Sequence, residues 1–100
     1  MLHVLWEFRV NPERVAQFEQ FYGPDGEWAQ LFRKGAGYRG TDLLRDCDDC
    51  LRYATIDKWE SRALYQAFRD AYATQYAEID AQCESFTVDE RSMGSFETIG

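Results

Sequence analysis

The side chain best suited to proton transfer in this sequence is His3, the only histidine among the 100 residues. Histidine is the one side chain whose ordinary pKa lies close to neutral pH, as a general base requires. His3 stands on the less apolar side of an alternating segment, from which it could reach a pocket or a dimer contact. Two interpretations therefore compete: a catalytic base, and an exposed or hydrogen-bonded histidine with a structural role only.

A second candidate for chemistry is the pair Cys47 and Cys50, which form a C-x-x-C pattern. The pattern falls in a polar turn and not at a helix N-terminus, where a redox pair would gain a lowered thiol pKa. A zinc ion would also need both remaining candidates, Cys83 and His3, as ligands. We therefore expect a solvated turn and no metal site, with a redox or metal sensor as a remote alternative.

Aromatic side chains are abundant, at 16% of the chain. Tyr65 and Tyr72 carry phenols that need hydrogen-bond partners when buried and could offer them to a phenolic ligand. Arg69 follows Tyr65 by one helical turn and could orient an enol or anionic oxygen. The competing interpretation is that these residues form core or solvated surface. The candidates for lining a pocket are Trp28, Trp59, Tyr65, Phe68, Arg69, Tyr72 and Tyr76.

Composition argues against several classes of partner and cofactor. The net charge is −7, and the eleven Lys and Arg are scattered, so we expect neither nucleic acid nor a membrane surface as a partner. No phosphate loop, dinucleotide fingerprint or nucleophile elbow occurs, and we expect no cofactor. Three cysteines and a charged N-terminal segment without a signal-peptide pattern favour a reducing cytoplasm.

The elements that would position these residues follow from periodicity within a single domain, residues 1–100. Leu2–Val10 alternates and predicts a strand with one apolar face. Asn11, followed by Pro12, predicts a helix start, and Asp25 is expected to cap a second helical stretch. Tyr38–Arg45 and residues 51–59 predict an antiparallel hairpin.

The second half of the chain predicts a long helix and a final strand. Ser61 is a natural N-cap, and the apolar stripe that follows it is interrupted near Thr74. Strand character resumes at Ser85, and Gly94 is expected to mark a bulge. The order β-α-β-β-α-β is that of the α+β ferredoxin-like sandwich, whose four-stranded antiparallel sheet has helices on one face only. The bare face favours a homodimer.

The segment 37–46, followed by Arg52, Tyr53 and residues 56–61, resembles the antibiotic biosynthesis monooxygenase (ABM) family of dimeric α/β barrel proteins. The opening strand, the helix around Tyr65 and the closing Met93, Gly94, Ser95 and Phe96 also fit. The resemblance implies a homodimer whose two sheets pack into a barrel, with a pocket between sheet and helices in each subunit. Family members include cofactor-free oxygenases of aromatic polyketides, haem-degrading enzymes and proteins without known activity.

Within this resemblance, the sequence matches the polyketide oxygenases only in part. Trp59 and Tyr65 stand where those enzymes have a tryptophan and a tyrosine, but Thr55 replaces their asparagine. The haem-degrading members have an asparagine and a histidine where this chain has Glu7 and, late in the second helix, Glu78 or its neighbours. Haem degradation is therefore disfavoured.

The leading functional hypothesis is a cofactor-independent monooxygenase acting on a small aromatic or enolic substrate. His3 would be the base, with Trp59 and Tyr65 as donors to the developing anion. Trp28, Phe68, Arg69 and Tyr72 would bind the substrate. The alternative is a non-catalytic small-molecule-binding or structural dimer of the same fold.

Overall fold

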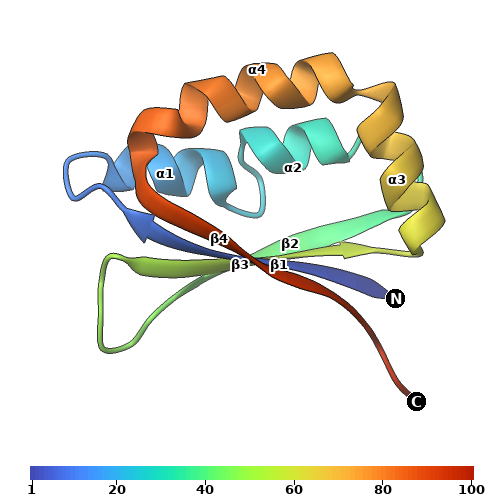
Figure 1. Cartoon of the computed structure of the whole chain (residues 1–100), viewed down its shortest axis with the longest axis horizontal. Helices are drawn as coiled ribbons and strands as arrows, with labels where there is room; N and C mark the ends of the chain where they lie inside the picture. The colour runs from blue at the N-terminus through green and yellow to red at the C-terminus, as the bar shows by residue number, and fades with distance from the viewer.

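The computed structural model describes residues 1–100 and shows a four-stranded antiparallel sheet with every helix on one face (Figure 1). The strand order is β2-β3-β1-β4, as the ferredoxin-like topology requires. The predicted fold class is therefore confirmed. The elements in chain order are β1 (Leu2–Val10), α1 (Val15–Tyr22), α2 (Glu27–Phe32), β2 (Tyr38–Arg45), β3 (Arg52–Trp59), α3 (Arg62–Ala71), α4 (Ala73–Cys83), the 3-10 turn η1 (Glu84–Phe86) and β4 (Thr87–Glu97).

β1 occupies a central position and pairs with both β3 and β4. Its alternation is confirmed, because Leu2, Val4, Phe8 and Val10 are buried under the helices. Trp6 shares their face but is only half-buried. Because β3 pairs antiparallel with β1, the β3 residues opposite these positions lie on the same covered face. They are Tyr53, Thr55, Asp57 and Trp59.

The first helix begins later than the sequence predicts. Asn11 does not cap it; the Asn11 side-chain oxygen accepts the backbone N–H of Glu13 at 3.0 Å, and α1 starts only at Val15. Asn side chains often close a local turn with the backbone two residues on, and here this turn replaces the helix start. The expectation of a helix from Asn11 was wrong for this reason.

The start of α2 also differs from expectation. Gly26, and not Asp25, is the N-cap residue, and the Asp25 carboxylate instead accepts a hydrogen bond from Arg33 at 2.6 Å. A Cβ at position 26 would lie 2.2 Å from the carbonyl oxygen of Gln20. Only glycine therefore allows the chain to turn this tightly between α1 and α2.

The helical region of the second half follows the prediction more closely. The Ser61 hydroxyl accepts the backbone N–H of Leu64 at 3.2 Å, which confirms the N-cap of α3. The interruption falls at Tyr72, with φ −115° and ψ 28°, two residues before the expected Thr74. α3 and α4 therefore run in different directions above the sheet (Figure 1).

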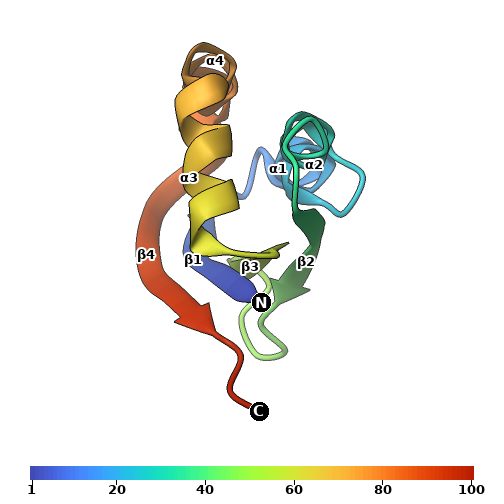
Figure 2. The ribbon, with the colours of Figure 1, turned by 90° about the vertical axis from the view of Figure 1, so that its right-hand side faces the viewer.

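The final strand forms one edge of the sheet, with α3 and α4 arching over its side (Figure 2). Its pairing with β1 shifts so that Leu5 faces Gly94 and Trp6 faces Ser92, leaving Met93 as the extra residue. Gly94 has φ +101°, which glycine adopts without strain. The expected bulge at Gly94 is confirmed.

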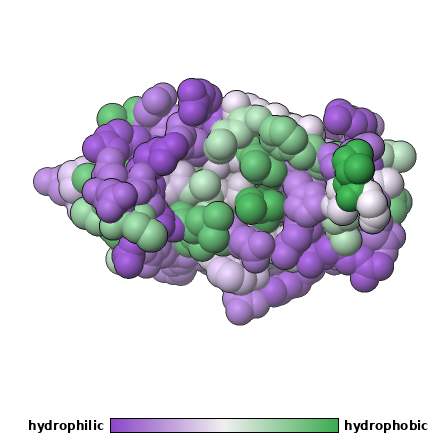
Figure 3. Space-filling view, turned by 90° about the horizontal axis from the view of Figure 1, so that it is seen from below, coloured by the Kyte–Doolittle hydropathy of each residue, from purple (hydrophilic) through white to green (hydrophobic).

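The sheet face away from the helices is partly apolar. Leu44, Met93 and Phe96 are exposed there, although they are large and hydrophobic. Figure 3 views this face from below and shows apolar surface gathered near its middle, with mixed polar and apolar surface toward both ends. None of the helices has the length and apolar character needed to cross a membrane.

Candidate functional site

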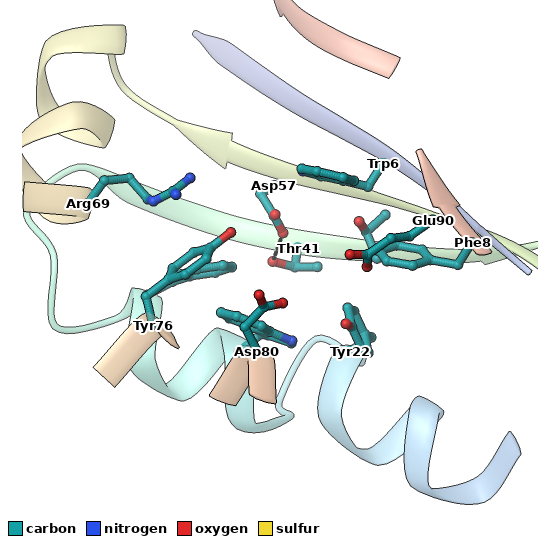
Figure 4. A pocket seen from close by; sticks show the side chains of 12 residues that line it. Trp6, Phe8, Tyr22, Thr41, Asp57, Arg69, Tyr76, Asp80 and Glu90 are labelled. Atoms are coloured by element: carbon teal, nitrogen blue, oxygen red, sulfur yellow. Dashed lines mark hydrogen bonds between the residues drawn. The ribbon is translucent and has the colours of Figure 1, made fainter. Parts of the chain in front are cut away.

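A cavity of about 240 Å³ lies between the covered face of the sheet and the helices (Figure 4). Strand side chains form one wall and side chains of α1, α2, α3 and α4 form the other. The volume suits a small ring system. The twelve lining residues are Trp6, Phe8, Tyr22, Trp28, Phe32, Thr41, Thr55, Asp57, Arg69, Tyr76, Asp80 and Glu90.

Aromatic rings make up the apolar part of this cavity. The rings of Trp28 and Tyr76 have centroids 4.7 Å apart, and those of Phe8 and Tyr22 are 4.8 Å apart. Burial raises the pKa of Tyr76 to about 12, so this phenol remains protonated at neutral pH. Such walls favour a flat, aromatic ligand.

A carboxylate stands on the sheet wall of this cavity. Asp57 projects from β3, and its Oδ1 accepts a hydrogen bond from the Thr41 hydroxyl at 2.7 Å. The Thr41 oxygen lies 2.6 Å from the Tyr38 hydroxyl. Because Thr41 has a single hydroxyl hydrogen and gives it to Asp57, Tyr38 must donate to Thr41. The three side chains form a directed chain of hydrogen bonds that ends on the Asp57 carboxylate.

The environment of Asp57 favours its neutral form. Burial raises the pKa of this carboxyl to about 6, even though the Thr41 hydrogen bond opposes the shift. No salt bridge reaches Asp57; the ion pairs of the chain lie elsewhere. A carboxyl that titrates near neutral pH inside a cavity is a marker of functional sites.

One cation faces the same space. Arg69 of α3 donates to the Tyr65 hydroxyl at 3.0 Å, and its guanidinium carbon lies 4.0 Å from the centre of the Tyr76 ring. These contacts hold the guanidinium at the edge of the cavity. The remaining charges are Asp80 and Glu90, which are both largely exposed. Partial desolvation of the Glu90 carboxyl, together with the nearby Asp80 and Asp89, raises its pKa. No group of three metal-ligating side chains occurs.

The structure brings two of the predicted substrate-binding residues, Trp28 and Arg69, into the cavity lining. Phe68 does not line it; only 3% of Phe68 is exposed, and its ring packs against Trp59 at 5.1 Å. Tyr72 is also outside the lining and donates its hydroxyl to the carbonyl oxygen of Lys34 at 3.4 Å. Both residues pack beside the site and do not face it.

The predicted donors Trp59 and Tyr65 also lie outside the lining. Trp59 is fully buried among Phe32, Phe68 and Tyr65, and its indole N–H has no hydrogen-bond partner. Tyr65 reaches the cavity only through Arg69. Direct catalytic roles for Trp59 and Tyr65 stay predictions.

The predicted base His3 lies on the opposite face of the sheet. It pairs with Lys58 and Phe96, whereas its neighbours Leu2 and Val4 point under the helices. Successive strand residues point to opposite faces, so His3 is separated from the cavity by the sheet itself. The structure therefore does not bring His3 together with the other candidates, and its catalytic role stays a prediction.

Sequence reasoning missed the polar part of the cavity, above all Asp57 and Thr41. The sequence did contain a sign of this: by strand alternation, Asp57 lies on the same side of β3 as the buried Tyr53, Thr55 and Trp59. A charged residue on the apolar face of an alternating strand must be desolvated or line a cavity. Asp80 and Glu90 gave no comparable signal, because each is exposed on its own element.

The cysteines lie apart from this site. Cys47 and Cys50 are exposed in the turn between β2 and β3, and Cys83 is buried at the end of α4. Burial raises the pKa of the Cys83 thiol to about 11, which keeps it protonated.

Comparison with solved structures supports the fold assignment. SnoaB, a cofactor-independent oxygenase from Streptomyces nogalater, aligns over 99% of this chain and 93% of its own, with a TM-score of 0.80 and 17% identity. Rv0793 from Mycobacterium tuberculosis aligns over 99% and 95%, with a TM-score of 0.75 and 15% identity. A conserved protein from Methanosarcina mazei Go1 aligns over 98% and 92%, with a TM-score of 0.73 and 11% identity. At these identities the likeness shows a shared fold.

Sequence comparison gives the family itself. A search of curated proteins found no match. The model of the family described as antibiotic biosynthesis monooxygenase, by contrast, matches residues 1–78, which include β1, the hairpin of β2 and β3, helices α1 to α3 and the first part of α4. The chain therefore belongs to the antibiotic biosynthesis monooxygenase family.

Proposed function

We propose that this protein is a cofactor-independent monooxygenase that acts on a small aromatic or enolic substrate in the cavity between sheet and helices. The observation that carries the proposal is an aromatic-walled cavity lined by the Asp57 carboxylate of β3 and the Arg69 guanidinium of α3. Membership of the family supports it, as does the shared fold with a cofactor-independent oxygenase.

The chemistry requires a substrate that becomes a good reductant when it loses a proton. An activated CH₂ group beside a phenol, as in an anthrone, gives a carbanion that passes electrons to dioxygen. One oxygen atom then becomes the new carbonyl oxygen and the other leaves as water, so that CH₂ and O₂ give C=O and H₂O. The protein would hold the substrate away from bulk water and stabilise its anion.

In this proposal, Arg69 stabilises the charge that develops on the substrate. Its guanidinium is the only cation among the lining residues, and Tyr65 and Tyr76 restrain it. The planar, permanently charged guanidinium can donate two N–H hydrogen bonds to an enolate oxygen. Tyr65 then acts as a positioning residue for Arg69, which gives this predicted site residue a role consistent with its location.

We also propose that the uncovered sheet face packs against a second copy of the chain. Leu44, Met93 and Phe96 expose apolar surface there, and Leu5 and Ile56 share the face by strand alternation. Two such faces placed together would bury this surface and close the dimeric barrel expected from the sequence.

The test of the proposed function is oxygen consumption by purified protein, free of metal and flavin, across hydroquinones, anthrones and other oxidisable phenols. Wild-type protein is expected to turn over at least one compound, and Arg69→Gln to lower kcat by about 10². Arg69→Lys keeps the charge without the planar fork and is the matched variant, with an intermediate rate. If ligands bind but oxygen consumption equals the buffer rate, the alternative of a non-catalytic small-molecule-binding protein holds.

A further inference from the structure

We propose that Asp57 is the general base of this site: its Oδ2 atom takes the acidic proton of the substrate, while Thr41 and Tyr38 hold the carboxylate in position. This inference rests on the proposed oxygenase function, because it names the group that starts the reaction. It replaces His3, the base expected from the sequence, which lies on the other face of the sheet.

The two oxygens of the Asp57 carboxylate have different surroundings. Oδ1 is fixed by the Thr41 hydroxyl at 2.7 Å, and Tyr38 in turn donates to Thr41 at 2.6 Å. Oδ2 makes no hydrogen bond within the chain, and it is not one of the fully buried polar atoms that lack a partner. Oδ2 is therefore accessible from the cavity. Figure 4 shows the carboxylate directed from β3 into the space between the sheet and α4. One oxygen is therefore held and the other is free to meet a ligand.

The other titratable groups around the cavity are poorer bases. Asp80 of α4 and Glu90 of β4 are exposed at its rim, where water competes for them. The phenol of Tyr76 loses its proton only near pH 12, and Arg69 remains a cation. Asp57 is the least exposed of the three carboxylates that line the cavity.

The burial of Asp57 explains why such a base works at neutral pH. Desolvation holds the pKa of Asp57 near 6, close to the pH at which a general base is most effective. Asp80, Glu90 and Arg69 also line the cavity, but the shift comes from desolvation, which the Thr41 hydrogen bond partly opposes. The carboxylate is thus ionised at neutral pH, yet basic enough to accept a proton from an activated phenol or CH₂ group.

Proton and electron transfers balance through one carboxylate. Asp57 removes the first proton, and the electron pair stays on the substrate carbon, which reduces and then binds dioxygen. The protonated Asp57 returns its proton to the peroxide that forms. It then removes the second proton from the same carbon as the O–O bond breaks, leaving the carbonyl product. The departing hydroxide takes up this proton as water, and Asp57 is again ionised.

The first experiment measures kcat/KM against pH for the purified protein with its best substrate from the panel. Wild-type activity is expected to fall as the pH drops through about 6, because the base becomes protonated. Asp57→Asn keeps an oxygen for Thr41 but cannot take a proton, so kcat falls by about 10² or more and the acidic limb disappears. A variant that keeps the wild-type rate and pH profile would overturn the inference.

Thr41→Val tests whether Thr41 positions the Asp57 carboxylate. The readout is the acidic limb of the pH profile, which the loss of a purely structural residue would not shift. The Thr41 hydrogen bond lowers the pKa of Asp57, so its removal should shift the acidic limb to higher pH while activity persists above it. Asp48→Asn is the matched control, because Asp48 is an exposed carboxylate in the turn between β2 and β3. It should leave the limb unchanged.

A second experiment does not depend on turnover. The side-chain carboxyl carbon of Asp57 is followed by NMR across pH, with and without 4-chlorophenol as a probe. The titration is expected near pH 6 in the free protein and should move when the phenol binds. If no compound is oxygenated but this shift occurs, the oxygenase function fails and the proton-accepting site stands. If turnover occurs and Asp57 neither titrates there nor senses the phenol, the inference fails and the function stands.

Discussion

The two faces of the same sheet treat their carboxylates in opposite ways. On the open face, Glu7 of β1 accepts hydrogen bonds from Arg52 and Arg91, both at 2.8 Å, and these cations lower its pKa. On the covered face, Asp57 of β3 has no cation bonded to it, and burial raises its pKa to about 6. In this sheet, cations on the open face hold the Glu7 carboxyl as an anion, whereas burial on the covered face raises the pKa of Asp57.

The same contrast extends to the apolar residues. Under the helices, aromatic rings pack against one another and line a cavity that also contains polar groups. On the open face, Leu44 and Phe96 stay exposed beside a network of charged pairs. We propose that the covered face carries the chemistry and that the open face carries the assembly.

The largest difference in stability is expected between Trp59→Ala and Phe96→Ala. Trp59 is fully buried against Phe32 and Phe68, so its truncation should lower the free energy of unfolding by about 3–5 kcal/mol. Phe96 is 55% exposed, so Phe96→Ala should lower the free energy of unfolding of the monomer much less. Urea unfolding at low protein concentration measures both. Equal losses would mean that the open face is also a packed core within one chain.

Asp57→Asn should stabilise the protein, and only above a certain pH. The folded pKa of about 6 lies above the ordinary value of 3.8, so the folded state holds the proton more tightly and wild-type stability falls as pH rises between these values. The variant removes this cost and should gain about 2 kcal/mol above pH 6, allowing for partial exposure of the carboxylate. Thermal unfolding across pH measures it. A constant gain at every pH would show that ionisation is not the cause.

Ile56→Asp should weaken association without harming the cavity. Ile56 pairs with Leu5 and Asp42, which places it on the open face, and a carboxylate there would be buried without a partner in the dimer. We expect the dissociation constant to rise at least about tenfold. Sedimentation over a concentration series measures it, with Asp70→Asn on exposed α3 as the control. Unchanged association would place the interface elsewhere.

The smallest effect is expected for Glu7→Gln on the open face. The lowered pKa of Glu7 means that its ion pairs stabilise the folded state above the unfolded-state pKa, and this is lost as pH falls through the folded pKa. The variant should therefore melt slightly below wild type at neutral pH and together with it in acid. High salt should also shrink the difference, because the arginines are largely exposed. A salt-independent loss would point to packing instead of charge.

Much of this organisation could be read from the chain. The alternation of Leu2, Val4, Phe8 and Val10, the Ser61 cap and the Gly94 bulge each depend on local geometry, and each was predicted. The start of α1 was missed because Asn11 can close a turn or cap a helix, and both use the same side-chain oxygen.

The candidate site was only partly predictable. Trp28 and Arg69 line the cavity as expected, whereas Phe68 and Tyr72 pack beside it. Helical spacing shows which side of a helix faces the sheet but not whether a given ring meets another ring or a space. The bend at Tyr72 sets that distance, and it aims Tyr76 and Asp80 of α4 into the cavity.

The sequence by itself determined the element order, the face of each strand residue and the family resemblance, because these depend on periods of two and 3.6 and on short motifs. That alternation already separates His3 from the covered face and gives Asp57 the parity of Trp59. Only the tertiary structure decided that Asp57 meets Thr41 and a cavity instead of a cation. The pKa of a carboxyl depends on burial and on partners from other strands and helices, and these contacts exist only once the sheet and helices have packed.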